Sequence, residues 1–196
     1  MSKLISEIRI AVSVIVLLGI ILCGLYPLVI KEVSGIIFPR LSQGSLVMSK
    51  GRITGSKLLA QRFSDMKYFH SRPSAAGSGY DPLASGGSNL GPLSRKLIET
   101  VRQNAIDYRR INHLPHSALV PVDAVTASAS GLDPHISVEN AFLQASRVAQ
   151  ARGVNLEYVK NRIRLHTEER DLGILGEPRV NVLMLNLDLD GIHDGN

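Results

Sequence analysis

The sequence predicts an α/β soluble domain, with mixed α+β organisation, attached to a single N-terminal transmembrane helix. Three observations support this fold class. A charge-free apolar run occupies residues 10–30, helical periodicity recurs in three later segments, and an alternating apolar run follows near the C-terminus. We expect residues 1–9 to be an N-terminal flank, 10–30 to be the transmembrane helix and 31–196 to form the soluble domain.

The first predicted element is the membrane anchor. The run Ile10–Ile30 holds no charged residue, and as a helix it would span about 32 Å, close to the ~30 Å hydrocarbon thickness of a bilayer. A cleaved signal peptide would need a shorter apolar core and a small-residue cleavage site, but no alanine occurs between Ala11 and Ala60. Gly19 and Gly24 would let a neighbouring helix approach closely, although an ordinary lipid-facing helix explains them equally well. Basic residues nearly balance across the run, so charge alone does not settle its orientation.

The start of the soluble domain has the pattern of a hairpin followed by a long loop. Apolar or β-branched residues at 45–47 and 52–54 flank Ser49–Gly51, which predicts a β-hairpin. Residues 70–92 form the longest Gly/Ser/Pro-rich stretch, and a loop of this length inside a compact domain is usually functional. A helix is then predicted over residues 92–110, with apolar residues along one face.

The C-terminal half has the signals of two more helices and a strand. One helix is predicted from an N-cap at Ser137 to Arg152, with Gly153 as its stop, and the next is capped by Asn155. The run Val180–Leu189 alternates with a period of two and is apolar on both faces for much of its length. This pattern predicts a strand in the centre of the sheet.

Composition narrows the classes of function. The chain of 196 residues has a net charge of +5, and its Lys and Arg are spread out rather than gathered in the dense stripe typical of a nucleic-acid binder. Its one cysteine, Cys23, lies in the apolar run, so the soluble domain has no disulfide, zinc–thiolate site or cysteine nucleophile. We therefore expect a lipid bilayer, and no nucleic acid, among the partners.

The usual catalytic signatures are missing from the sequence. It contains no P-loop, no G-x-S-x-G elbow, no H-E-x-x-H helix and no D-K-T-G-T motif of a phosphorylated pump. Its six histidines do not fall in a spacing typical of metal ligands, so we predict no catalytic residue and no metal site. A hydrolytic set can be drawn from Ser128, Ser130, Asp133 and His135, but such residues are easily found in any chain of this length.

Two polar segments remain. Ala84–Ser88 precedes a predicted helix, and exposed N–H groups in such a loop can bind an anion, although a flexible turn with positive φ is the plainer interpretation. In Ser128–His135, the pair Asp133-Pro134 fits a turn into the next helix. The turn does not explain His135.

Several strings in the same order resemble the C subunit of the bacterial Kdp potassium-transporting ATPase, and the resemblance runs nearly from end to end. Besides the anchor, the strings are Gly55–Phe63, Tyr68–Ala75, Ser85–Pro92, Pro121–Ser128, Ser130–Ser137, Arg147–Ala149 with Arg152-Gly153, and Gly176–Leu183. These strings contain a polar set of His70, Arg72, Asp123, Ser128, Asp133, His135 and Asn181. Ala60 departs from the family pattern, which usually has glycine there.

The resemblance implies a non-catalytic subunit of a high-affinity potassium import complex in the bacterial inner membrane. Its partners would be a channel-like subunit that binds potassium and a P-type subunit that hydrolyses ATP. The C subunit of that family assists assembly and raises the ATP affinity of the hydrolysing subunit, with its N-terminus inside and its domain outside the cytoplasm.

The resemblance also suggests a nucleotide contact. Ser85, Gly86, Gly87 and Ser88 resemble part of the signature loop of ABC transporters, which makes ATP a candidate ligand through the complex, with no other cofactor. A domain outside the cytoplasm would not be expected to contact ATP directly. Two other classes of function stay open: a membrane-anchored extracytoplasmic binding or sensor domain, and an anchored hydrolase.

Overall fold

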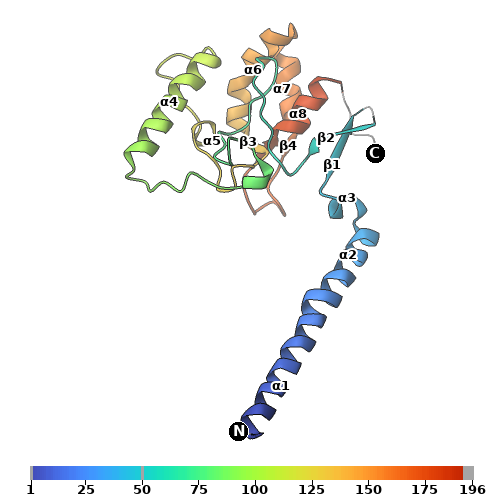
Figure 1. Ribbon diagram of the computed structural model, residues 1–196. Coiled ribbons are helices and arrows are strands. Elements are labelled where there is room, and N and C mark those ends of the chain that lie inside the picture. Colours follow the sequence, from blue (N-terminus) through green and yellow to red (C-terminus); the bar gives the residue numbers. More distant parts are fainter. Residues whose placement is uncertain (1, 50, 192–196) are drawn as a thin grey trace. The chain divides into compact units, whose positions relative to one another are not determined.

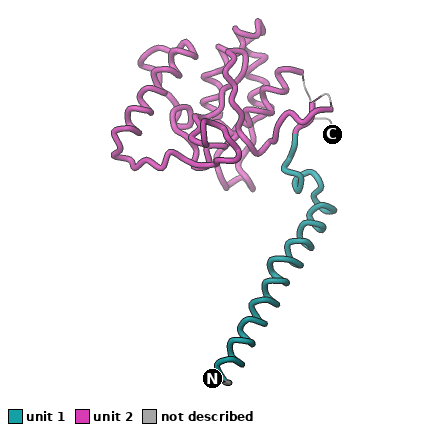
Figure 2. The backbone as a smooth tube through the Cα atoms, in the orientation of Figure 1, with its two compact units in different colours: residues 1–46 teal, residues 47–196 magenta. Residues whose placement is uncertain are grey.

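The computed structural model describes residues 2–49 and 51–191 (Figure 1). The chain divides between Leu46 and Val47 into two compact units, drawn in teal and magenta in Figure 2. Each unit is described by itself below.

The first unit is dominated by one long apolar helical stretch. Lys3–Ile37 is 35 residues long, and its most apolar window has a mean hydropathy of 2.7 and no buried residue. At 1.5 Å per residue it extends for about 52 Å, more than enough to cross the hydrocarbon core. The predicted apolar helix is therefore present, and it continues beyond residues 10–30 at both ends. The stretch is made of α1 (Ser2–Gly19), the π-helical η1 (Ile20–Leu25) and α2 (Tyr26–Ile37), and the short helix α3 (Pro39–Ser42) follows it.

The second unit mixes helices with two small sheets. Strands β1 (Leu46–Ser49) and β2 (Arg52–Ser56) pair with each other, which confirms the predicted hairpin, although Lys50 of its turn lies outside the described residues. An antiparallel sheet of order β3-β5-β4 forms from His135–Ser137, Arg179–Asn181 and Thr167–Glu168 respectively. The helices are η2 (Pro82–Ala84), α4 (Arg95–Ile111), α5 (Val122–Val125), α6 (Val138–Arg152), α7 (Leu156–Leu165) and α8 (Val182–Leu189).

Local capping signals place most helix ends. Ser137 Oγ accepts a hydrogen bond from the backbone N–H of Asn140 at the start of α6, and Gly153 ends that helix with φ +64°. Asn155 caps α7 in the same way. Helix α4 begins at Arg95 rather than at residue 92, because Ser94 is its N-cap.

The predicted strand over Val180–Leu189 is wrong beyond its first two residues. Only Arg179–Asn181 is extended, as β5, and Val182–Leu189 is helix α8. Asn181 ends the strand and caps helix α8, since its side chain accepts a hydrogen bond from the backbone N–H of Met184. Helix α8 is buried on several sides, so its residues are apolar at nearly every position and no helical period is visible. β5 does lie in the middle of its sheet.

The core forms where α6, α7 and α8 lie side by side (Figure 1). Phe69, which belongs to no helix or strand, is completely buried among them. The side-chain amide of Asn186 pairs with both backbone groups of Phe69, at 2.8 and 3.0 Å. Gln144 does the same for His70, at 2.8 and 3.2 Å. Buried irregular backbone must find hydrogen-bond partners, and here two amide side chains replace a neighbouring strand.

Candidate functional site

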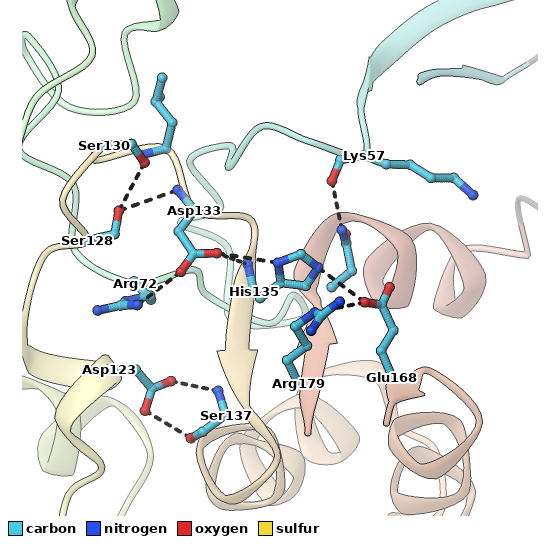
Figure 3. Close-up of polar contacts among 12 residues, drawn as sticks. Lys57, Arg72, Asp123, Ser128, Ser130, Asp133, His135, Ser137, Glu168 and Arg179 are labelled. Atoms are coloured by element: carbon cyan, nitrogen blue, oxygen red, sulfur yellow. Dashed lines mark hydrogen bonds and ion pairs between the residues drawn. The ribbon is translucent and has the colours of Figure 1, made fainter. Parts of the chain in front are cut away.

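The sheet brings five charged or titratable side chains together in what we call the β3 cluster: Arg72, Asp133, His135, Glu168 and Arg179 (Figure 3). His135 stands on β3, Glu168 on β4 and Arg179 on the central β5. Antiparallel register places Glu168 opposite Arg179 and Ser137 opposite the same residue on the other side. Asp133 precedes β3, and Arg72 reaches in from the irregular segment before η2.

In the β3 cluster, basic and acidic side chains alternate along a chain of contacts. Arg72 Nη1 lies 3.0 Å from Asp133 Oδ2, and the other oxygen of Asp133 accepts the His135 backbone N–H at 3.0 Å. The His135 ring lies between two carboxylates, with Nδ1 3.4 Å from Asp133 Oδ1 and Nε2 3.6 Å from Glu168 Oε2. Arg179 Nε closes the chain at 3.0 Å from Glu168. Burial alone would raise the pKa of Asp133, but hydrogen bonds from His135 and the Arg72 guanidinium outweigh it and lower that pKa.

Two open pockets meet at the cluster. One, of about 710 Å³, is lined by Leu58, Leu59 and residues 127–130, among others. The second, of about 440 Å³, is bordered by Asp123, His135 and Arg179, among others. Arg72 and Asp133 line both pockets. Their ion pair therefore borders both pockets and presents one positive and one negative charge there.

The cluster does not assemble a serine hydrolase. Ser130 Oγ accepts the backbone N–H of Leu132 at 3.1 Å, and Ser128 Oγ lies 3.5 Å from both Ser130 Oγ and the Asp133 backbone nitrogen. Both ring nitrogens of His135 face carboxylates instead of a hydroxyl. A serine nucleophile needs a base within hydrogen-bond reach, so this geometry speaks against the anchored-hydrolase alternative.

Hydrogen bonds that support the fold, with partners outside the cluster, engage three other predicted polar residues: Asp123, Asn181 and His70. Asp123 on α5 accepts hydrogen bonds from the backbone N–H and hydroxyl of Ser137 and from the Asn140 amide, at 2.8, 2.9 and 2.8 Å. Asn181 donates to the carbonyl of Lys57 at 2.8 Å. The imidazole of His70 is within 3.2 Å of a backbone carbonyl, and burial together with a nearby arginine charge lowers its pKa.

The segment Ser85–Ser88 is joined by its backbone to residues 128–131. The Gly86 N–H donates to Ser130 O at 2.9 Å, and the Ser85 hydroxyl donates to the same oxygen at 3.0 Å. A Cβ on Gly87 would stand 3.0 Å from Ala129 O, whereas one on Gly86 would meet nothing within 4 Å. A side chain at 87 would therefore need the backbone at Ala129 to shift slightly, so the close approach favours glycine there. Positive φ in this stretch belongs to Asn89, at +51°, and to neither glycine.

Arg147 is the buried residue that sequence reasoning passed over. It is 2% exposed, and its guanidinium donates to Asn112 Oδ1, Gln144 Oε1 and the carbonyls of Met66 and Tyr68. Burial lowers its pKa to about 10. Its place in a matched family string was the available signal. Glu168 lies in no such string, and only the sheet register brings it to His135.

Among residues 2–49 and 51–191, no group of three or more His, Cys, Asp or Glu is arranged to hold a metal ion. His193 lies outside those residues. The predicted nucleotide contact at Ser85–Ser88 stays a prediction.

Comparison with known proteins gives consistent matches over almost the whole length. Residues 8–191 match the family described as KdpC, the c chain of K+-transporting ATPases. The chain is 49% identical over 180 residues to the potassium-transporting ATPase KdpC subunit of Mycobacterium bovis (strain BCG / Pasteur 1173P2), covering 92% of this chain and 95% of the relative. It is 47% identical to proteins of the same name from Nitratidesulfovibrio vulgaris, covering 98% of both chains, and from Acidobacterium capsulatum, covering 96% of this chain and 100% of the relative.

Proposed function

The chain belongs to the KdpC family of K+-transporting ATPase subunits, and we propose that it is a membrane-anchored, non-catalytic subunit that assists assembly of the pump. Its partners would be the channel-like subunit that binds potassium and the P-type subunit that hydrolyses ATP. We further propose that it sits in the bacterial inner membrane with the second unit outside the cytoplasm.

The observation that carries this proposal is the apolar helix. In Lys3–Ile37 the most apolar window has no buried residue, so this surface needs lipid or the helices of another chain to cover it. Within the helix, a Cβ on Gly19 or Gly24 would meet nothing within 4 Å. Small residues on an otherwise bulky helix are where another transmembrane helix can come close. The helix is thus suited both to anchoring and to packing in a membrane complex.

The experiment is a pull-down of the tagged full chain in mild detergent, from cells grown at limiting potassium so that the pump is expressed. We expect the potassium-binding and ATP-hydrolysing subunits to be recovered with it. Recovery of the chain alone would reject the subunit proposal and favour an anchored binding domain. Replacing Ile10–Ile30 by an unrelated transmembrane helix then separates packing from tethering, since only a specifically packed helix loses partners on replacement.

We propose, as a finer role, that the subunit raises the ATP affinity of the hydrolysing subunit. Gly86 is the suitable position at which to test whether nucleotide contacts Ser85–Ser88. A side chain there would point into open space, so the fold should tolerate the substitution. In the whole complex, Gly86→Val should raise the KM for ATP if nucleotide approaches this loop. An unchanged KM in a complex that assembles normally would reject the loop as a nucleotide contact and leave the assembly role standing.

A further inference from the structure

The connection between β4 and β5 ends in an exposed apolar tip, formed by Leu172, Ile174 and Leu175. Their exposed fractions are 90%, 76% and 56%. Single exposed leucines are common on protein surfaces and need no explanation. Three large apolar side chains around one turn expose a larger apolar surface at one place, and contact of that surface with water is unfavourable.

The tip is held in a defined conformation. Asp171 and Leu175 exchange both of their backbone hydrogen bonds at 2.9 Å, which closes a turn of three residues. Ion pairs brace the base of the turn, between Arg170 and Glu177 at 2.7 Å and between Arg179 and Asp171 at 3.6 Å. Leu172 itself has a φ of +55°, a conformation that leucine rarely adopts. Because these contacts already hold the apolar loop in one conformation, it loses less conformational entropy when it binds a partner.

The charge around the tip is opposite to that of the unit that carries it. Residues 168–179 include four acidic and two basic side chains, for a net charge of −2. The whole unit from residue 47 to 196 has eighteen basic and fifteen acidic residues, for a net charge of +3. An anionic lipid surface attracts basic segments and repels this one. A protein surface with basic residues around an apolar pocket complements it.

We propose that the apolar tip is a docking point for a protein partner that offers an apolar pocket rimmed by basic side chains. This inference rests on the proposed function, which makes the chain one subunit of a larger complex, and it names the surface through which the second unit binds. Burial of the tip supplies affinity, and the acidic base of the turn supplies orientation.

The test uses the full chain in the assembled pump. The double substitution Leu172→Ser with Ile174→Ser removes two highly exposed side chains and should weaken retention of the pump subunits at least about tenfold. The matched control is Leu83→Ser with Leu119→Ser, which removes two leucines of 96% and 85% exposure elsewhere on the unit and should leave retention unchanged.

A charge variant tests the basic rim. Glu169, an exposed residue, lies at the base of the turn, so Glu169→Lys should weaken retention and the loss should shrink at high salt. If both tip and charge variants retain their partners like the wild type, the docking inference is wrong while the subunit proposal survives. If the wild-type chain retains no partner, the subunit proposal itself fails.

A third measurement separates protein from lipid. The chain has no tryptophan, so Ile174→Trp introduces a single reporter at the tip. We expect its emission to shift to the blue when the pump assembles. In phosphatidylcholine–phosphatidylglycerol vesicles with brominated acyl chains and no other subunit, we expect no quenching. Quenching there would overturn the inference and assign the tip to the bilayer.

Discussion

Asp123→Asn is the substitution that best tests how the start of α6 is held. The carboxylate of Asp123 accepts three hydrogen bonds of 2.8 to 2.9 Å, two from Ser137 and one from the Asn140 side chain. Asparagine has the same shape but carries no charge, and one of its two positions becomes an N–H donor. At best two of the three bonds survive, and they become neutral.

The magnitude follows from these contacts. Hydrogen bonds to a charged group contribute roughly 1.5–3 kcal/mol and neutral ones about 0.5–1.5 kcal/mol, so losing the charge on two bonds costs about 2 kcal/mol and losing the third bond costs about 2 kcal/mol more. For a domain of this size the combined loss lowers the melting temperature by roughly 8–16 °C. Asp123→Ala should lower it further, because two N–H donors and one hydroxyl donor then lose their acceptor.

The assay is thermal unfolding of the full chain in mild detergent, followed by circular dichroism, in which the second unit supplies the transition. The matched control is Asp107→Asn, the same chemical change on α4 at a side chain that pairs with its helical neighbours Gln103 and Arg110. We expect its midpoint to stay at the wild-type value. Equal midpoints for Asp123→Asn and the wild type would refute the reasoning.

Three further outcomes can be measured in the same way. Arg147→Met should destabilise by about 3 kcal/mol, because two backbone carbonyls and an asparagine oxygen lose their donor, and Arg147→Lys should recover part of this. Burial lowers the pKa of His70, so its imidazole is protonated at a higher pH in the unfolded chain than in the folded one. The stability of the folded chain should therefore fall as the pH drops below about 6.5, and it should fall less steeply in the His70→Gln variant. Gly87→Ala should lower the melting temperature through its contact with a backbone carbonyl, whereas Gly86→Ala should not.

The sequence by itself determined the features that depend on neighbours in the chain. The long apolar helix was predictable because hydrophobicity and length, the properties that suit a helix to span a membrane, are read from the sequence without any tertiary contact. The caps at Ser137 and Asn155 and the stop at Gly153 were predictable for the same reason, since each acts within four residues. The family was recognisable from strings of residues in order, before any fold was known.

Only the tertiary structure decided how distant segments meet. Val182–Leu189 is a helix packed from several sides, and that packing removes the periodicity by which a helix is recognised in a sequence. The two polar segments singled out by sequence, around Gly86 and Ser130, prove to be joined by backbone hydrogen bonds. His135 lies beside Glu168 because of the register of three short strands. That register depends on packing between segments far apart in the sequence, which no local pattern encodes.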